Sequence, residues 1–228
     1  MSALLIASTD SDTGKTVLTS ALAAYWQTHC AGRSLGIMKP VQSGIGDREL
    51  YMRLFALNQS LTETNPIYFD LPLAPPIAAD KEGRRINLET AWQAFEALSQ
   101  KKDWVLVEAL GSLGSPVTYE STVADLAWDW QIPLVLVVPV KLGAIGQAVA
   151  NIALARQARV HIKGIVLNCV VPCTKQDVKD WAPANLIQSL TQVPVLGLIP
   201  HLPDPTNLAD LTKVASNLEL EQLMPISF

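Results

Sequence analysis

Cysteine is scarce in this chain, which has three: Cys30, Cys169 and Cys173. Their number is odd, and no CxxC pair of the kind found in zinc sites and redox motifs occurs. This pattern argues against a disulfide scaffold and fits reduced thiols, so we predict a cytoplasmic protein. Long apolar runs and a Lys- or Arg-led leader at the N-terminus are also missing, so we expect no membrane partner.

Basic runs are missing as well. The 17 basic and 21 acidic residues give a formal net charge of −4, and no segment interleaves basic with aromatic side chains. We therefore expect no nucleic-acid partner. Apolar residues, by contrast, are plentiful: 49% of the 228 residues are hydrophobic, which is enough for one large core. Residues 1–228 are predicted to form a single α/β domain.

The segment Ser8–Thr16 lies between an apolar run at 3–7, predicted to be a buried strand, and a helical pattern at 17–26. A strand, a loop ending in Gly-Lys-Thr and a helix form the context of a phosphate-binding P-loop. In such a loop, backbone N–H groups and the helix dipole attract an anion. Lys15 can then reach the outer phosphates, and the Thr16 hydroxyl can ligate a phosphate-bound Mg²⁺.

The match to the P-loop pattern G-x-x-x-x-G-K-[ST] has one exception, because Ser8 occupies the position of the first glycine. Ser8 has to adopt the backbone conformation of the loop without the freedom of glycine. The alternative is that Gly14-Lys15-Thr16 is an ordinary helix start that matches the pattern by chance.

Short apolar strands alternate with helical patterns along the rest of the chain. Strands are predicted at 35–38, 104–107, 134–138, 164–167 and 195–199, and helices at 47–57, 88–99, 123–130, 143–158 and 208–215, with a further helix interrupted near Pro183. Residues 41–46 are predicted to be loop, and residues 60–86, which contain four prolines, an irregular excursion over one face of the sheet. This alternation is typical of an α/β fold of the P-loop NTPase type, a mostly parallel sheet with helices on both faces.

Polar side chains follow the predicted strands in series. Besides the P-loop, the residues that follow an apolar strand in this way are Lys39, Glu108, Lys141 and Asn168. Parallel sheets bind ligands at the carboxyl ends of their strands. We therefore expect these side chains to form one composite site.

Several motifs, taken together and in order, cover nearly the whole chain. They are Thr9–Thr16, Lys39-Pro40-Val41-Gln42-Ser43-Gly44, Val105-Leu106-Val107-Glu108, Val140-Lys141-Leu142-Gly143, the strand-end Asn168 and Leu196-Gly197-Leu198-Ile199-Pro200. Their combination resembles dethiobiotin synthetase. The resemblance implies a homodimeric enzyme of biotin biosynthesis. It would use ATP and Mg²⁺ to carboxylate 7,8-diaminopelargonic acid with CO₂ and close the ureido ring of dethiobiotin.

The resemblance also implies a role for each matched position. Lys39 is the implied catalytic residue, which stabilises developing negative charge, and the implied Mg²⁺ ligands are Thr16, Asp47 and Glu108. The residues implied to contact ATP are Asp12, Thr13, Gly14, Lys15, Thr16 and Val17 at the phosphates, Asp47, Glu108, Ala109, Leu110 and Gly111 near the reacting centre, and Asn168, Cys169, Pro200, His201 and Leu202 around the adenine. The residues implied to contact the diamine are Ser43, Gly111, Lys141, Gly143 and Ala144, with its carboxylate held at the helix start after Gly143 across a dimer interface.

Simpler explanations remain open for several of these residues. Asp47 could be a helix N-cap, Glu108 part of a structural salt bridge, and Lys39 a solvated lysine at a strand end. Lys141 is equally well explained as a structural lysine that binds backbone carbonyl groups, and Asn168 as a turn residue.

The sequence also departs from the family pattern. Ala109 and Leu110 stand in a segment that is usually rich in glycine, Asp12 stands where glutamate is common, and Gly146 lacks the polar side chain expected near the substrate carboxylate. Two other functions therefore stay open. One is a dimeric switch ATPase of the partitioning type, although the extra early lysine of that group is missing from positions 9–11. The other is a relative that binds nucleotide without catalysis.

Overall fold

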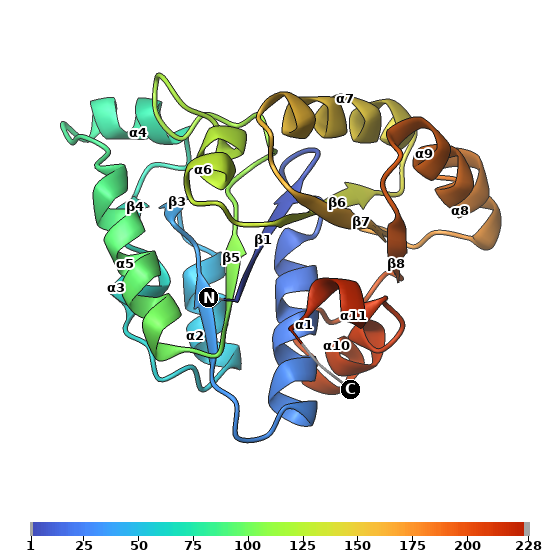
Figure 1. Ribbon diagram of the computed structural model, residues 1–228, viewed down its shortest axis with the longest axis horizontal. Helices are drawn as coiled ribbons and strands as arrows, with labels where there is room; N and C mark the ends of the chain where they lie inside the picture. Colours follow the sequence, from blue (N-terminus) through green and yellow to red (C-terminus); the bar gives the residue numbers. More distant parts are fainter. Residues whose placement is uncertain (1, 226–228) are drawn as a thin grey trace.

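Six strands form the central sheet of the computed structural model, which describes residues 2–225 (Figure 1). The strands are β1 (Ala3–Ser8), β2 (Leu35–Met38), β5 (Trp104–Glu108), β6 (Leu134–Pro139), β7 (Ile162–Asn168) and β8 (Val195–Ile199). Their spatial order is β2-β5-β1-β6-β7-β8, and every neighbouring pair is parallel. Because all six run the same way, their carboxyl ends meet at one edge of the sheet.

Helices cover both faces of this sheet. One face carries α1 (Lys15–His29), α2 (Asp47–Leu54), α10 (Leu208–Ala215) and α11 (Leu220–Leu223), and the other carries α5 (Leu88–Lys101), α6 (Val123–Asp129), α7 (Ala144–Gln157) and α9 (Ala184–Thr191). The strands are almost wholly apolar because both of their faces are buried. Leu4 and Ile6 belong to the apolar layer of α1, whereas Leu5 and Ala7 belong to the opposite layer. The predicted parallel sheet with helices on both faces is confirmed.

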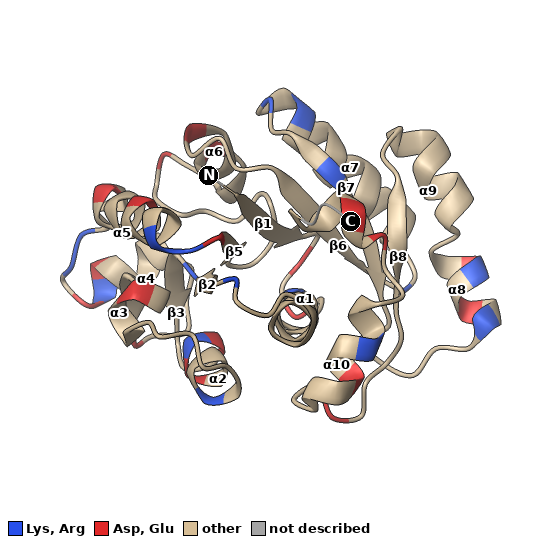
Figure 2. Cartoon of the chain, turned by 60° about the horizontal axis from the view of Figure 1, so that its bottom comes forward, with Lys and Arg blue, Asp and Glu red and all other residues tan. Residues whose placement is uncertain are grey.

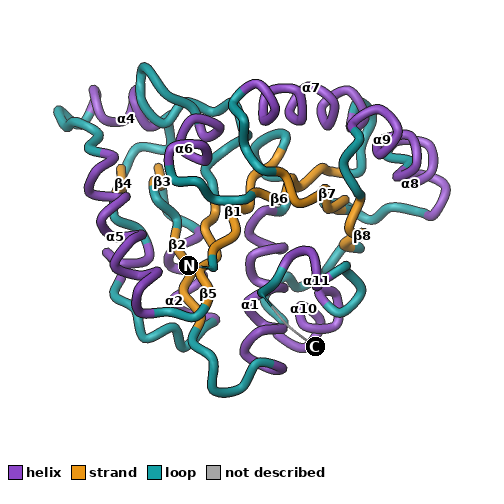
Figure 3. The backbone as a smooth tube through the Cα atoms, viewed as in Figure 1, coloured by secondary structure: helices purple, strands orange, loops and turns teal. Residues whose placement is uncertain are grey.

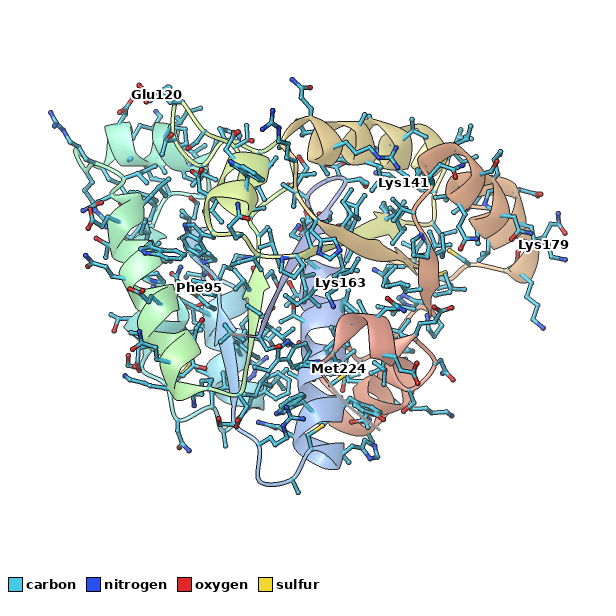
Figure 4. All side chains as sticks on the ribbon, in the orientation of Figure 1. Phe95, Glu120, Lys141, Lys163, Lys179 and Met224 are labelled. Carbon is cyan, nitrogen blue, oxygen red and sulfur yellow. The ribbon has the colours of Figure 1, made fainter. Side chains whose placement is uncertain are left out.

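Aromatic side chains fill both apolar layers. Trp26 of α1 and Trp104 of β5 are buried, with their ring centroids 5.0 Å apart. Phe95 lies between α5 and the sheet (Figure 4), where it stacks on Trp130 with a centroid distance of 5.2 Å. The first contact packs α1 on the sheet, and the second packs α5 against the end of α6 on the opposite face. The helix that the sequence predicts to be interrupted near Pro183 is indeed two helices, α8 (Lys175–Trp181) and α9.

The segment between β2 and α5 is more regular than the sequence indicates. The prediction that residues 41–46 form a loop is wrong for 41–43, because β3 (Val41–Ser43) pairs in parallel with β4 (Ile67–Phe69) beside the main sheet (Figure 3). The excursion predicted at 60–86 also contains α3 (Leu61–Thr64) and α4 (Pro75–Lys81). A strand of three residues carries too little alternation to be recognised, and its partner is distant in sequence. The two prolines that open α4 do not break it, since N–H groups in a first helical turn have no helical partner.

Residues 59–65 complete the free edge of β2. The Gln59 side chain accepts from the N–H of Ile37 and donates to its carbonyl, both at 3.0 Å. The backbone N–H of Lys39 donates to the Thr64 carbonyl at 2.7 Å. The side-chain amide of Asn65 in turn donates to the Lys39 carbonyl at 2.7 Å. This segment therefore holds the backbone of Lys39, the residue that follows β2.

Charged side chains lie mainly on the outer helices. In Figure 2, basic and acidic segments lie next to each other along α2, α8 and α10, whereas the central strands carry few charges. Across residues 2–225, no helix combines the length and apolar character needed to cross a membrane.

Candidate active site

The P-loop joins β1 to α1 at the carboxyl edge of the sheet (Figure 1). Gly14, the N-cap residue of α1, has a left-handed backbone with φ of +93°, and Asp12 is left-handed as well, with φ of 52°. A Cβ atom at Gly14 would lie 2.0 Å from Asn168 Nδ2, so only glycine fits there. This turn directs the unpaired N–H groups at the start of α1 into the loop, as a phosphate site requires.

Ser8 replaces the first glycine of the pattern without strain, because it still belongs to β1 and its backbone is extended. Its hydroxyl oxygen lies 2.6 Å from the Asp10 carbonyl oxygen and 3.0 Å from that of Gly111. It also accepts a 3.0 Å hydrogen bond from Lys15 Nζ. Burial lowers the pKa of Lys15, although the charge of Glu108 opposes the shift. Ser8 thus holds the Lys15 ammonium group inside the P-loop.

Lys39 is the centre of a buried charge network. Its ammonium group is paired with Asp47, the first residue of α2, and lies 2.9 Å from Glu108 Oε1 at the end of β5. Burial alone would lower the pKa of Lys39, but the charges of Glu108 and Asp47 outweigh burial and raise it. Burial is likewise the largest single effect on Asp47 and opposes its ionisation, but the charge and hydrogen bond of Lys39, together with the Thr16 hydroxyl and the charge of Lys15, outweigh burial and lower the pKa of Asp47. Lys39 is 5% exposed, so it is not a solvated strand-end lysine.

Thr16 connects the P-loop to both carboxylates. Its hydroxyl oxygen lies 3.0 Å from Asp47 Oδ1 and 3.1 Å from Glu108 Oε1. Three residues that are far apart in sequence therefore meet at one point, as the sequence predicts. Asp47 is not the N-cap of α2, because Gly46 holds that position. Glu108 does form a salt bridge, but its partner is Lys39, which belongs to the same site.

The donor set formed by Thr16, Asp47 and Glu108 suits Mg²⁺. All of its atoms are hard oxygens, the ligands that Mg²⁺ takes together with water and phosphate. Lys15 and Lys39 balance two of the three carboxylates that line the smaller cavity, those of Asp12, Asp47 and Glu108, so its formal charge is −1. A divalent cation is therefore best accommodated together with phosphate anions, not alone.

Glu108 has two further partners that are not predicted from the sequence. Thr19 Oγ1 lies 3.0 Å from Glu108 Oε2, and the Tyr51 hydroxyl donates to the same oxygen. Burial, followed by the charge of Glu108, raises the pKa of Tyr51 well above its ordinary value, so the hydroxyl keeps its proton. Tyr51 lies four residues after Asp47, so both side chains share one face of α2. This spacing is the sequence signal that could have identified the tyrosine.

Two cavities adjoin at Lys39. The smaller, of about 170 Å³, is bounded by P-loop residues 11–16 together with Lys39, Asp47, Glu108 and Gly111. The larger, of about 580 Å³, is bounded by residues 11–12, 42–47, 72–75, 110–111 and 115–116 and by Lys39, and it shares residues 11–12, Lys39, Asp47 and Gly111 with the smaller cavity. Ligands in the two cavities would therefore meet at this lysine. Val17 lies outside both cavities, packed against the apolar layer of α1.

The residues predicted near the reacting centre are divided between the larger cavity and the core. Ser43, Leu110 and Gly111 line the larger cavity. Within the described chain, the buried Ser43 Oγ has no hydrogen-bond partner. Gly111 is left-handed, with φ of +50°, and a Cβ there would lie 2.2 Å from Ser115 Oγ. Ala109 belongs to the apolar core and lines neither of the two cavities, so the structure does not bring it into the site.

The residues predicted around the adenine lie at the ends of two paired strands. Asn168 and Ile199 are partners at the ends of β7 and β8, and residues 200–202 follow directly. Asn168 Nδ2 donates to the Thr13 carbonyl at 2.7 Å, so this side chain supports the P-loop and is not a free turn residue. Cys169 is buried, and His201 Nδ1 lies 3.0 Å from the carbonyl oxygen after it, that of residue 170. In the described chain, none of these predicted residues lines either cavity.

Lys141, Gly143 and Ala144 lie at the start of α7, where Figure 4 shows Lys141 at the turn from β6. Lys141 Nζ lies 3.4 Å from Asp10 Oδ2 of the P-loop, and both side chains are about half exposed. Gly143 is the left-handed N-cap of α7, with φ of 89°, and Ala144 is buried. None of the three lines either cavity in the described chain, so the structure does not join them to the site within one subunit.

Comparison with known proteins gives both a family and a fold. A family model described as an AAA domain matches residues 2–209. An ATP-dependent dethiobiotin synthetase of Gloeothece citriformis is 55% identical over 226 residues, which covers 99% of this chain and 100% of the relative. Proteins of the same name from Synechocystis sp. and Gloeobacter violaceus are 50% and 41% identical, covering 96% and 97% of this chain and 94% and 95% of the relatives.

Solved structures with a similar fold include two P-loop ATPases. The MinC:MinD cell division protein complex of Aquifex aeolicus has a TM-score of 0.59 at 18% identity, with 100% of this chain and 98% of that chain covered. A ParA family ATPase from Chlorobium tepidum has a TM-score of 0.55 at 13% identity, with 99% and 94% covered. Identities this low establish a shared fold and nothing about activity.

Proposed function

This chain belongs to the family of ATP-dependent dethiobiotin synthetases, and we propose that its reacting centre lies where the two cavities meet at Lys39. Its function is that of a dethiobiotin synthetase, an ATP-using enzyme of the ligase class. The proposed substrates are 7,8-diaminopelargonic acid, CO₂ and ATP, and the products are dethiobiotin, ADP and phosphate. The observation that carries this assignment is that one buried lysine borders both cavities and is paired with Glu108 and Asp47.

The smaller cavity is the proposed site of the ATP phosphates. It is lined by the P-loop, whose glycine turn and helix start favour an anion. Lys15 is the proposed partner of the outer phosphates, since its ammonium group already lies inside this loop, on Ser8. For the adenine we propose Asn168, Cys169 and residues 200–202. Asn168 supports this, because its bond to the Thr13 carbonyl leaves Oδ1 to accept from a base.

The larger cavity is the proposed site of the diamine. Its volume of about 580 Å³ is within the range of small-molecule pockets. The unpaired Ser43 hydroxyl supplies a hydrogen-bond partner for an amine of the substrate or for its carbamate. Leu110 and Pro72–Pro75 provide the apolar lining that a carbon chain requires.

Lys39 is the proposed catalytic residue. An amine of the substrate adds to CO₂ to give a carbamate and loses a proton. A carbamate oxygen then attacks the γ-phosphorus and displaces ADP, which gives a carbamoyl phosphate. The second amine attacks the carbonyl carbon of this group, loses a proton and expels phosphate as the ring closes. The carbamate and the γ-phosphate are both anionic, so bringing them together requires a positive charge between them. Lys39 is the cation that borders both cavities, and its raised pKa keeps it charged. Positioning of the two reactants supplies much of the remaining rate enhancement.

Thr16, Asp47 and Glu108 are the proposed Mg²⁺ ligands, directly or through water. When bound with ATP, Mg²⁺ neutralises charge on the phosphoryl group that is transferred. The chain's own contribution is to hold one oxygen of each carboxylate about 3 Å from the Thr16 hydroxyl, which lies between them. Lys39 is paired with both carboxylates and favours the ionised form of Asp47, the form that a hard cation binds.

We also propose a homodimer. Large apolar side chains are exposed in the loops that follow β3, β6 and β7, on the carboxyl edge of the sheet: Ile45 is 86% exposed, Leu142 85% and Val171 58%. A second copy covering this edge would bring the start of its α7 to the larger cavity and complete the carboxylate site proposed at Gly143 and Ala144. Sedimentation of a Leu142→Glu variant tests this, because a charge in the interface should shift the chain toward monomer. An unchanged sedimentation coefficient for wild type and variant at monomer mass would contradict the dimer.

Two further proposals concern the whole chain. A cytoplasmic location is supported by Cys30, Cys169 and Cys173, all of which are free thiols. A single domain is supported by the two apolar layers, which share one sheet and extend from β1 to α11. Limited proteolysis should release no stable half of the chain.

The decisive assay is dethiobiotin formation. The purified chain is supplied with 7,8-diaminopelargonic acid, bicarbonate and MgATP, and the product is identified by mass spectrometry. We expect product to require all three, and phosphate release to be nearly absent without the diamine. Rapid ATP hydrolysis that ignores the diamine, without dethiobiotin, would instead indicate a switch ATPase. Nucleotide binding with neither activity would indicate a relative that has lost catalysis.

A further inference from the structure

The two carboxylate oxygens of Glu108 have different surroundings, although the side chain is completely buried. Oε1 faces the proposed site, where it lies 2.9 Å from Lys39 Nζ and 3.1 Å from Thr16 Oγ1. Oε2 faces the protein interior, where it meets the Thr19 and Tyr51 hydroxyls. The orientation of the carboxylate therefore depends on what holds Oε2.

Counting protons identifies the group that holds Oε2. The Thr19 hydroxyl has one proton but two acceptors, since it lies 3.0 Å from the Lys15 carbonyl oxygen and 3.0 Å from Glu108 Oε2. The Tyr51 hydroxyl also has one proton, and an ionised carboxylate can only accept. Tyr51 must therefore donate to Oε2, whether Thr19 bonds to the carboxylate or to its own helix.

Tyr51 is well placed to act as a rigid support. It is fully buried, and its ring belongs to the apolar layer of α1, so its position is fixed by packing. It shares α2 with Asp47, one helical turn earlier. The helix α2 therefore supplies one carboxylate of the proposed metal site, that of Asp47, and contacts the other, that of Glu108, through Tyr51.

We propose that Tyr51 is a positioning residue for Glu108: its hydroxyl holds Oε2 and thereby directs Oε1 toward Thr16 and the phosphate cavity. The proposal deepens the proposed function, because it assumes that Glu108 is a metal ligand. Hydrogen bonds that orient a metal ligand contribute about 10- to 100-fold to metal affinity or activity. Loss of the hydroxyl should therefore weaken Mg²⁺ binding without altering the P-loop itself.

The test is the Tyr51→Phe variant, which keeps the buried ring and removes the hydroxyl. Titration calorimetry with ADP is performed in Mg²⁺ and in EDTA, and the ratio of the two affinities is compared with wild type. We expect the gain in ADP affinity from Mg²⁺ to fall by about 10-fold or more, while the affinity in EDTA changes less than about 2-fold. Tyr25→Phe is the matched control, since Tyr25 packs on His29 farther along α1 and should leave both affinities unchanged.

A purely structural role gives a different result. In that case Tyr51→Phe lowers the melting temperature but leaves the ratio of the ADP affinities in Mg²⁺ and in EDTA unchanged. This outcome overturns the proposal. If the Phe variant does not fold, Tyr51→Leu removes the same hydroxyl together with the ring, and an unchanged effect of Mg²⁺ on ADP affinity in that variant likewise overturns the proposal. Thr19→Val should have the smaller effect, and a larger loss than in Tyr51→Phe would overturn the assignment of Tyr51 as the main donor.

The proposed function is checked separately, by dethiobiotin formation in the wild type. An active wild type whose Mg²⁺ ratio is unaffected by Tyr51→Phe refutes the positioning role alone. A wild type that makes no dethiobiotin, but loses Mg²⁺ affinity on Tyr51→Phe, supports the positioning role and refutes the reaction.

Discussion

The side-chain amide of Asn65 donates a 2.7 Å hydrogen bond to the backbone carbonyl of Lys39 and a 3.0 Å bond to the carbonyl of Ile67. Asn65 is 3% exposed and lies where α3 leads into β4. Lys39 follows β2, which is an edge strand of the six-stranded sheet formed by the described residues. The Asn65 side chain therefore gives the backbone carbonyl of Lys39, the proposed catalytic residue, the hydrogen bond that a further strand would otherwise provide.

Replacing Asn65 by alanine should leave two buried carbonyl groups without their donor. We expect a loss of about 1–3 kcal/mol in the free energy of unfolding, measured by urea denaturation. Turnover should fall about 10-fold, because small displacements of a catalytic group are costly, while ADP affinity stays unchanged. Asn151→Ala is the control, since Asn151 donates only within α7, to the Gln147 carbonyl. Equal effects of both substitutions would contradict a specific role for Asn65.

The two lysines of the site should act at different stages. Lys15→Met should weaken ATP binding by about 10- to 100-fold, the loss of one charge-assisted contact. Lys39→Met should lower turnover by about 10²- to 10³-fold with little change in ATP affinity, because the negative charge that Lys39 stabilises develops only during the reaction. Calorimetry and single-turnover rates separate the two effects. Equal losses of ATP affinity in both variants would refute the assignment of Lys39.

Gly14 should tolerate no side chain. A Cβ there would lie 2.0 Å from Asn168 Nδ2, and its φ of +93° disfavours other residues. We expect Gly14→Ala to abolish detectable ADP binding in calorimetry. Gly146→Ala is the comparison, because nothing lies within 4 Å of its Cβ position in α7. That variant should keep ADP affinity and gain up to about 1 kcal/mol of stability. Normal ADP affinity in Gly14→Ala would show that the loop has another conformation.

Glu63 should make the stability of the segment beside Lys39 depend on pH. The N–H of Ser60 and then Lys101 lower the pKa of Glu63 from 4.5 to about 2. Since the folded-state pKa is depressed, the stabilisation is fully present above pH 4.5 and is lost as the pH falls toward 2. Glu63→Gln should therefore cost less than about 1 kcal/mol at pH 7, as expected for an exposed group, and progressively less below pH 4.5. Urea denaturation at several pH values measures this, with the exposed Glu96→Gln of α5 as control. A difference from wild type that is independent of pH would be contrary to this account.

Much of the site could be predicted because its parts are local in sequence. The P-loop is a contiguous motif, and Glu108 and Asn168 each end an apolar strand whose burial is visible in its composition. In a parallel sheet such strand ends must share one edge. The neighbourhood of Thr16 and Glu108 follows from that geometry, whereas Asp47 was implied by the family resemblance alone. In the structure one oxygen of each carboxylate lies about 3 Å from the Thr16 hydroxyl.

Other features depend on contacts between distant segments, which no local pattern contains. The pairing of β3 with β4 was beyond sequence analysis because each strand has three residues. Ala109 turns into the core although its neighbour Leu110 lines the larger cavity, a choice made by packing against β1 and α6. The start of α7 does not reach that cavity within one chain, so its proposed role requires a second copy.

By itself, the sequence determined the α/β fold, the phosphate-binding loop and the family, because hydrophobic periodicity and motif spacing act over short stretches of chain. Only the tertiary structure decided how the site is held. It brought Tyr51 and Thr19 to the inner oxygen of Glu108 and Asn65 to the backbone of Lys39. The physical reason is that a buried charge or carbonyl must find a partner wherever packing brings one, and packing joins residues that the sequence keeps far apart.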